Sequence, residues 1–150
     1  MPFLKYLLYT VLFSSISGCC NYVDCSGDNY DFVFVVQDTI ADMDLVFGAN
    51  SIYDKSKMKC YSVLGNDTIY YGISFIEYHS SLVDSAISIN LFPEVKNEIY
   101  LVLDAMDTDT LFATYNSNDT RCCGYITEIV SITINSKKFK INYRPILISK

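Results

Sequence analysis

His79 is the single histidine of this 150-residue chain and the first candidate for catalysis. It lies in EYHSS (77–81), where Glu77 or Ser80 would be its partner in acid–base chemistry. A general base needs such a partner within hydrogen-bonding reach, and it needs a pocket for the substrate. No nucleophile elbow, glycine-rich phosphate loop or HExxH motif accompanies His79. A polar surface histidine in a loop is the favoured interpretation, and a small hydrolase using His79 is the alternative.

Three aspartates, Asp104, Asp107 and Asp109, stand close together in DAMDTDT (104–110). Clustered carboxylates can bind calcium, but an EF-type loop also needs a central glycine and a distal glutamate. Aspartate in a tight turn commonly accepts hydrogen bonds from its own backbone. The pattern favours a turn between two strands. The cysteine spacing is also poor for zinc, so we predict no metal, cofactor or catalytic residue.

The N-terminal leader indicates export. Lys5 supplies one positive charge, and no acidic residue precedes Asp24. The apolar run YLLYTVLFSSI (6–16) is much shorter than the roughly 20 residues that a membrane-spanning helix needs. A charged start, a short apolar run and small residues at its end are typical of a secretory signal.

Ile16-Ser17-Gly18-Cys19 resembles the lipobox of bacterial lipoproteins, in which an aliphatic residue and two small residues precede an obligatory cysteine. The resemblance implies a diacylglyceryl group on the Cys19 sulfur, cleavage before Cys19 and an acyl chain on its new amino group. Two or three acyl chains anchor a protein stably, whereas one binds only marginally.

This resemblance divides the chain into a signal peptide (1–18), a lipidated tether (19–30) and a domain (31–150). It also implies location in the bacterial cell envelope. Cys20 replaces the aspartate that retains some lipoproteins in the inner membrane, which favours the outer membrane. The alternative is an ordinary signal peptide and a secreted soluble domain without lipid.

Five cysteines remain if Cys19 carries lipid: Cys20, Cys25, Cys60, Cys122 and Cys123. Disulfides are permitted in an exported protein, and the odd number leaves at least one thiol outside intrachain bonds. Cys60 lies in an expected strand and is interpreted as a small buried hydrophobe. Neighbouring residues of a strand point to opposite faces, so a direct bond between Cys122 and Cys123 is disfavoured. A bond from Cys25 to either would pin the tether to the domain.

The charge balance argues against nucleic acid as a partner. The formal charge is −6, and loss of the leader with its one lysine makes it −7. Binding to nucleic acid requires clustered Lys and Arg that neutralise phosphates. Basic residues do gather in SKKFK (136–140), with Arg144 nearby. The favoured interpretation is a solvated hairpin end, and a binding patch is the alternative.

The apolar residues are mainly Ile, Val, Tyr and Phe, which suit pleated sheets. The expected strands are 31–38, 44–48, two within 59–76 joined through Gly65-Asn66-Asp67, 85–92, 98–105, 110–116, 124–135, 137–143 and the final RPILIS. Short strands at this spacing predict an all-β fold, an antiparallel β-sandwich of about eight strands and Ig-like. The alternative is an α+β domain with one helix near 50–59.

The function expected from the sequence rests on a resemblance and on the tyrosines. CYS (60–62), DTL (109–111) and RCCGY (121–125), together with the lipobox, resemble small envelope lipoproteins of bacteria, a group with no established activity. We expect a non-enzymatic domain that binds or scaffolds an envelope protein or glycan. Tyrosine gives contact area at low entropy cost, and six tyrosines are candidates for a ligand face: Tyr53, Tyr61, Tyr70, Tyr71, Tyr78 and Tyr100.

Overall fold

The computed structural model describes residues 30–80, 83–93, 98–120, 122–141 and 144–150. Every helix or strand within these ranges is a β-strand, so the prediction of an all-β fold is confirmed. The strands are β1 (Asp31–Asp38), β2 (Met43–Asp44), β3 (Lys59–Leu64), β4 (Asp67–Tyr71), β5 (Ile73–Ser80), β6 (Val83–Asn90), β7 (Ile99–Val102), β8 (Thr108–Thr120), β9 (Gly124–Ile134), β10 (Lys137–Lys140) and β11 (Ile146–Ser149).

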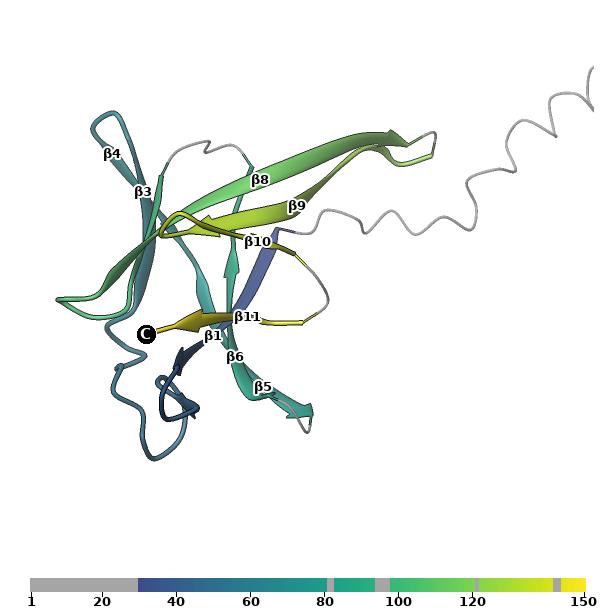
Figure 1. The fold of residues 1–150 in the computed structure, drawn as a ribbon. Helices are drawn as coiled ribbons and strands as arrows, with labels where there is room; N and C mark the ends of the chain where they lie inside the picture. The colour runs from purple at the N-terminus through teal and green to yellow at the C-terminus, as the bar shows by residue number, and fades with distance from the viewer. Residues whose placement is uncertain (1–29, 81–82, 94–97, 121, 142–143) are drawn as a thin grey trace, which may run out of the picture.

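The strands form two sheets that pack as a β-sandwich. One sheet has the order β11-β1-β6-β5, with β2 paired to the end of β1, and the other has the order β10-β9-β8-β7-β3-β4. Only β11 and β1 pair in parallel among the described strands. In Figure 1 the β8–β9 ribbon crosses the upper part of the molecule, with β1, β5 and β6 below it.

The core lies between the sheets because apolar side chains alternate along the strands. From one sheet come Phe32, Phe34 and Val36 of β1 and Ile87 and Ile89 of β6, all fully buried. From the other come Ile99, Leu101, Leu111 and Ile132, which are almost or fully buried. Val35, on the opposite face of β1, is also buried. This fits the prediction that 31–38 is a central strand that is apolar on both faces.

The predicted helix of the α+β alternative does not form. Residues 50–58 make turns that lead into β3. The Asp54 carboxylate accepts hydrogen bonds from the backbone and the hydroxyl of Ser56. An aspartate that bonds its own backbone in this way competes with helix formation.

The prediction of a strand over 44–48 was wrong beyond Asp44. The Asp44 carboxylate accepts the backbone N–H groups of Val46 and Phe47, at 2.8 and 2.9 Å, which closes a turn. Gly48 follows with a φ of +85°, a backbone conformation that glycine adopts without strain. The apolar side chain of Val46 is buried as expected, but Val46 lies in a turn and not in a strand.

The prediction of two strands within 59–76 was also incomplete, because this segment contributes to three. β3 and β4 form the predicted hairpin, with Gly65 at φ +63° in the turn. After Gly72, β5 begins and joins the other sheet by pairing with β6. The chain therefore crosses between the layers at a glycine within an apolar run that looks continuous in the sequence.

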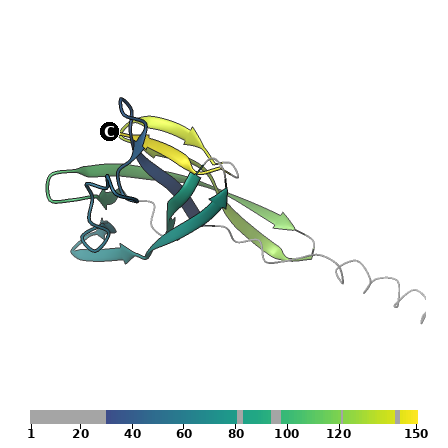
Figure 2. The same ribbon diagram turned by 90° about the horizontal axis from the view of Figure 1, so that it is seen from below.

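In the β8–β9 hairpin, which projects beyond the core, β8 is longer than the predicted strand 110–116, whereas β9 is one residue shorter than the predicted strand 124–135. β8 has 13 residues and β9 has 11, with a register shift between Thr114 and Tyr115. Figure 2 shows the far end of this ribbon extending away from the two sheets. Most side chains of the distal part, 116–128, are exposed or half-buried. We call this part the distal arm.

Candidate functional site

Three tyrosines on neighbouring strands line up across the outer face of the six-stranded sheet. Tyr61 of β3 stands directly opposite Tyr70 of β4 on one side and Tyr100 of β7 on the other. The ring centroids are 6.0 Å apart for Tyr61 and Tyr70, and 5.4 Å apart for Tyr61 and Tyr100. These distances are typical of favourable aromatic pairs. We call these three residues the tyrosine ladder.

The ladder faces solvent because its neighbours along β3 fill the opposite side. Cys60 and Ser62 flank Tyr61 and are buried toward the core. Tyr70 has 67% of its surface exposed. Two residues along the strands, Val63 and Phe112 lie on the same face and are each 45% exposed. Exposed apolar side chains that adjoin one another commonly mark an interaction surface.

Glu98 adds a charged acceptor to this face. The Tyr100 hydroxyl donates a hydrogen bond to its carboxylate over 2.7 Å. This bond, with smaller contributions from burial and from the negative charge, raises the pKa of Tyr100 above its ordinary value. The hydrogen bond to Glu98 holds the Tyr100 hydroxyl in one orientation.

The other tyrosine candidates do not join the ladder. Tyr53 and Tyr71 are 7% and 4% exposed and belong to the core cluster. The Tyr71 and Ser62 hydroxyls lie 3.2 Å apart, and burial raises the pKa of Tyr71. The side chain of Tyr78 lies outside what the structure describes. Three of the six sequence candidates thus share one face.

Sequence reasoning missed Val63, Glu98 and Phe112 as members of this surface. The signal was present in the alternation of β3 and β8, since residues two apart share a face. What the sequence lacks is the strand order: β7 lies between β3 and β8 only because the chain leaves this sheet for β5 and β6 and then returns.

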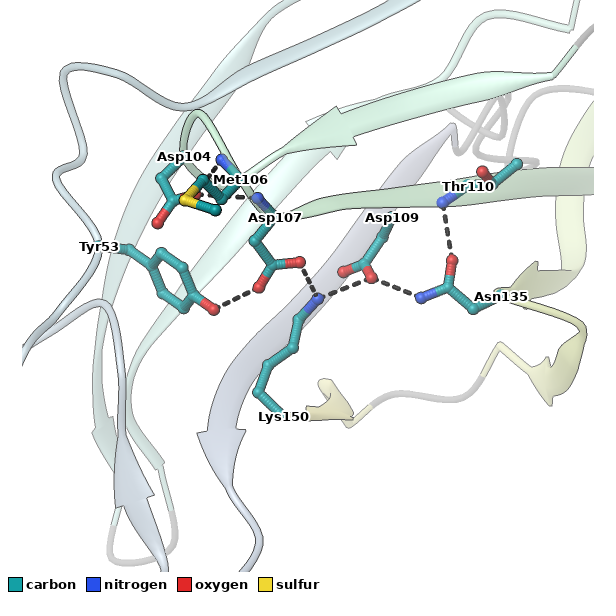
Figure 3. Close-up of polar contacts among 8 residues, drawn as sticks. All are labelled: Tyr53, Asp104, Met106, Asp107, Asp109, Thr110, Asn135 and Lys150. Atoms are coloured by element: carbon teal, nitrogen blue, oxygen red, sulfur yellow. Dashed lines mark hydrogen bonds and ion pairs between the residues drawn. The ribbon is translucent and has the colours of Figure 1, made fainter.

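The three aspartates of 104–110 have different roles. The Asp104 carboxylate accepts the backbone N–H groups of Met106 and Asp107, at 2.7 and 2.9 Å, as the turn interpretation expects. Asp107 and Asp109 instead bind the Lys150 ammonium, at 2.6 and 2.7 Å (Figure 3). A lysine therefore occupies the place between the two carboxylates that a cation would need. Within the described residues, no group of three or more His, Cys, Asp or Glu side chains could hold a metal ion.

Further hydrogen bonds connect this cluster to the loop before β3 and to the turn between β9 and β10. The Tyr53 hydroxyl donates to Asp107, and the Asn135 amide donates to Asp109 over 2.5 Å. Asp109 is 1% exposed, and its second carboxylate oxygen has no hydrogen-bond partner among the described residues. Burial acts to raise the pKa of Asp107, but the bonds from Lys150 and Tyr53 outweigh it and hold that pKa below its ordinary value. We interpret the cluster as a structural lock that joins Lys150 to the start of β8.

The cysteines fall into two groups. Cys60 is a free thiol, 1% exposed, and burial raises its pKa to about 12. It is therefore the small buried hydrophobe that its position in a strand predicts. Cys122 and Cys123, at the tip of the distal arm, are both disulfide-bonded. Cys19, the lipidation candidate, and Cys25, the predicted disulfide partner, lie outside the described residues.

His79 lies in β5 and not in the loop that its polar neighbours suggested. Glu77 and Ser80 belong to the same strand, and the register of β5 against β6 shifts between them. The side chains of residues 77–80 are not among those the structure describes. A catalytic role for His79 therefore stays a prediction.

The comparisons with known proteins add no family. The structure shows no helix long and apolar enough to cross a membrane in the part of the chain it describes, which excludes residues 1–29. No family model, curated protein or solved structure matches the chain.

Proposed function

We propose that this chain is a lipid-anchored lipoprotein of the bacterial envelope whose β-sandwich binds a ligand and catalyses no reaction. The tyrosine ladder is the observation that carries the binding role. It combines three neighbouring aromatic rings, tilted against one another by 52° and 34°, with a fixed hydroxyl on Tyr100 and the acceptor Glu98 on one face. Folding alone does not require Tyr70 to expose two thirds of its surface.

A saccharide chain is the ligand class that fits this face best. The negative face of an aromatic ring attracts the polarised C–H bonds of a sugar ring. Tyrosine hydroxyls and the Glu98 carboxylate can exchange hydrogen bonds with sugar hydroxyls at the edge of the stack. Because the rings already contact one another, little side-chain entropy is lost when a ligand binds. The alternative partner is an envelope protein, and the experiment must distinguish it from a saccharide.

The anchor of this proposal rests on the lipobox at Ile16–Cys19. The first described strand, β1, begins at Asp31, so a tether over 19–30 would connect the lipid directly to the sandwich. Such a tether would hold the ladder close to the membrane and allow it to reach envelope glycans. The outer membrane is the expected location.

A glycan array probed with the mature protein in detergent tests the binding role. We expect binding to one class of envelope saccharide, which is lost in the double variant Tyr61→Ser/Tyr70→Ser. Tyr125→Ser is the matched control, because Tyr125 is 75% exposed but lies in the distal arm. An array on which the protein binds nothing, or on which the double variant binds as the wild type does, would contradict a saccharide ligand. Crosslinking to a protein through the ladder would favour the alternative.

A further inference from the structure

A basic groove runs between β10 and β11, at the opposite edge of the sheet from β4. Its volume is about 590 Å3. Four cationic side chains line it: Lys137, Lys138 and Lys140 of β10, and Arg144 in the segment before β11. Figures 1 and 2 both show β10 and β11 side by side on the same flank of the molecule.

The charge of this groove is opposite to that of the whole chain. Four of the 11 lysines and arginines line it, whereas the chain carries a net charge of −6. No Asp or Glu is among the described residues that line it. A concave site with charges of one sign concentrates ligands of the other sign and speeds their association.

The walls of the groove are strand edges with apolar side chains. β10 is the outermost strand of one sheet and β11 is the outermost strand of the other. Phe139 and Leu147 line the groove between the cations, and Leu147 is 49% exposed. The Lys137 ammonium lies 5.2 Å from the centroid of the Phe139 ring. Charge and apolar surface therefore alternate along the groove.

We propose that this groove binds an acidic, extended segment of a partner protein. Such a segment lies along a strand edge and places alternate side chains on opposite sides. Its carboxylates would pair with Lys138, Lys140 and Arg144, and its apolar side chains would contact Phe139 and Leu147. A phosphate polymer would use the cations but leave the apolar wall without a partner, so the lining favours a peptide. This site is independent of the saccharide proposed for the tyrosine ladder.

Lysines on an edge strand also prevent one sheet from pairing with another. That protective role explains Lys138 and Lys140 on their own. It does not explain Arg144, which lies outside any strand, or the exposed apolar wall beside β11. The combination of both features is what indicates a ligand.

Fluorescence anisotropy with a labelled decapeptide of alternating Glu and Val tests the proposal on the mature full-length protein. We expect saturable binding that weakens as salt rises, and about a tenfold loss of affinity in Lys138→Glu/Arg144→Glu, since charged contacts at an interface are worth this much or more. Lys59→Glu, an exposed lysine of β3, is the matched control and should bind as the wild type does. Thermal unfolding of each variant verifies that the exposed substitutions leave the fold intact.

Two further probes separate a peptide groove from a general anion site. The same decapeptide with Gln in place of Glu should bind at least tenfold more weakly. Leu147→Ser, which leaves the cationic side chains in place, should weaken the binding of the acidic peptide. The proposal would be overturned in favour of a phosphate site if inorganic polyphosphate bound more tightly than the peptide and if Leu147→Ser left its affinity unchanged. Absence of peptide binding to the wild type would also overturn it.

Discussion

Lys150 is the residue whose role is least visible in the sequence and clearest in the structure. Its side chain is 18% exposed and binds two carboxylates, one of which, Asp109, is 1% exposed. Removing one partner of a buried ion pair leaves an uncompensated charge, and this costs more than the pair itself contributes. The stability of the sandwich should therefore depend on this lysine far more than on a surface lysine.

We predict that Lys150→Met lowers the free energy of unfolding by about 3 kcal/mol at pH 7. The control is Lys57→Met, because Lys57 makes an exposed ion pair with Asp54 at 3.6 Å. Exposed pairs contribute about 0.5 kcal/mol or less. Urea unfolding followed by circular dichroism measures both values. Equal losses in the two variants would show that the cluster in Figure 3 is not a lock.

The lowered pKa of Asp107 predicts how the free energy of unfolding changes at acidic pH. Its pKa in the folded protein lies below the ordinary value of 3.8. A carboxyl group of this kind stabilises the fold at a pH above its unfolded pKa, and the contribution is lost as the pH falls through the folded pKa. The difference in unfolding free energy between wild type and Asp107→Asn should be constant from pH 7 to about 5 and should shrink below pH 3.8. A difference that grows toward low pH would contradict this assignment.

At the scale of elements, the sequence predicted strands well where polar or turn residues bound an apolar or alternating run. Residues 31–38 match β1 without error, and 124–135 differs from β9 by one residue. The prediction of a strand over 44–48 was wrong because the Asp44 side chain closes a turn, which an apolar pattern does not reveal. The prediction missed the crossing at Gly72, because contacts between residues distant in the sequence decide which sheet a strand joins.

The distal arm should be the least protected element against hydrogen exchange. Its side chains lie mostly outside the core, whereas β1 and β6 supply many of the fully buried ones. Local opening costs little where few apolar contacts are lost. Hydrogen exchange measured by mass spectrometry should show faster exchange for 116–128 than for 31–38 and 83–90. Equal protection of the arm and of β1 would show that the arm unfolds together with the core.

At the scale of the whole molecule, the N-terminal anchor is a sequence-based proposal about where the sandwich works. We predict that the mature protein begins with a lipid-modified Cys19 and partitions into detergent. Cys19→Ser should remain uncleaved and lose that partitioning, because the serine offers no thiol for the lipid. Intact-mass spectrometry measures the lipid and the cleavage site, and detergent phase separation measures the partitioning. An unmodified Cys19 or a different first residue would favour the secreted soluble alternative.

The candidate site was predictable only in part at this scale. Tyrosine abundance indicated a ligand face, but Tyr53 and Tyr71 proved to be core residues and only the order β4-β3-β7 identified which rings align. The basic groove also depends on long-range arrangement, because β11 reaches the flank of β10 through its pairing with β1. The periodicity of a strand determines which of its side chains share a face. The order of strands in the sheets determines which of these side chains become neighbours.

The most direct test of the proposed function compares two exposed tyrosines in one binding measurement. Isothermal titration calorimetry with the saccharide selected on the array should show about fivefold weaker binding for Tyr61→Ala, because the loss of one aromatic contact costs about 1 kcal/mol. Tyr125→Ala should bind with the affinity of the wild type. Equal affinities for Tyr61→Ala and the wild type, with both proteins folded, would contradict the tyrosine ladder as the binding face.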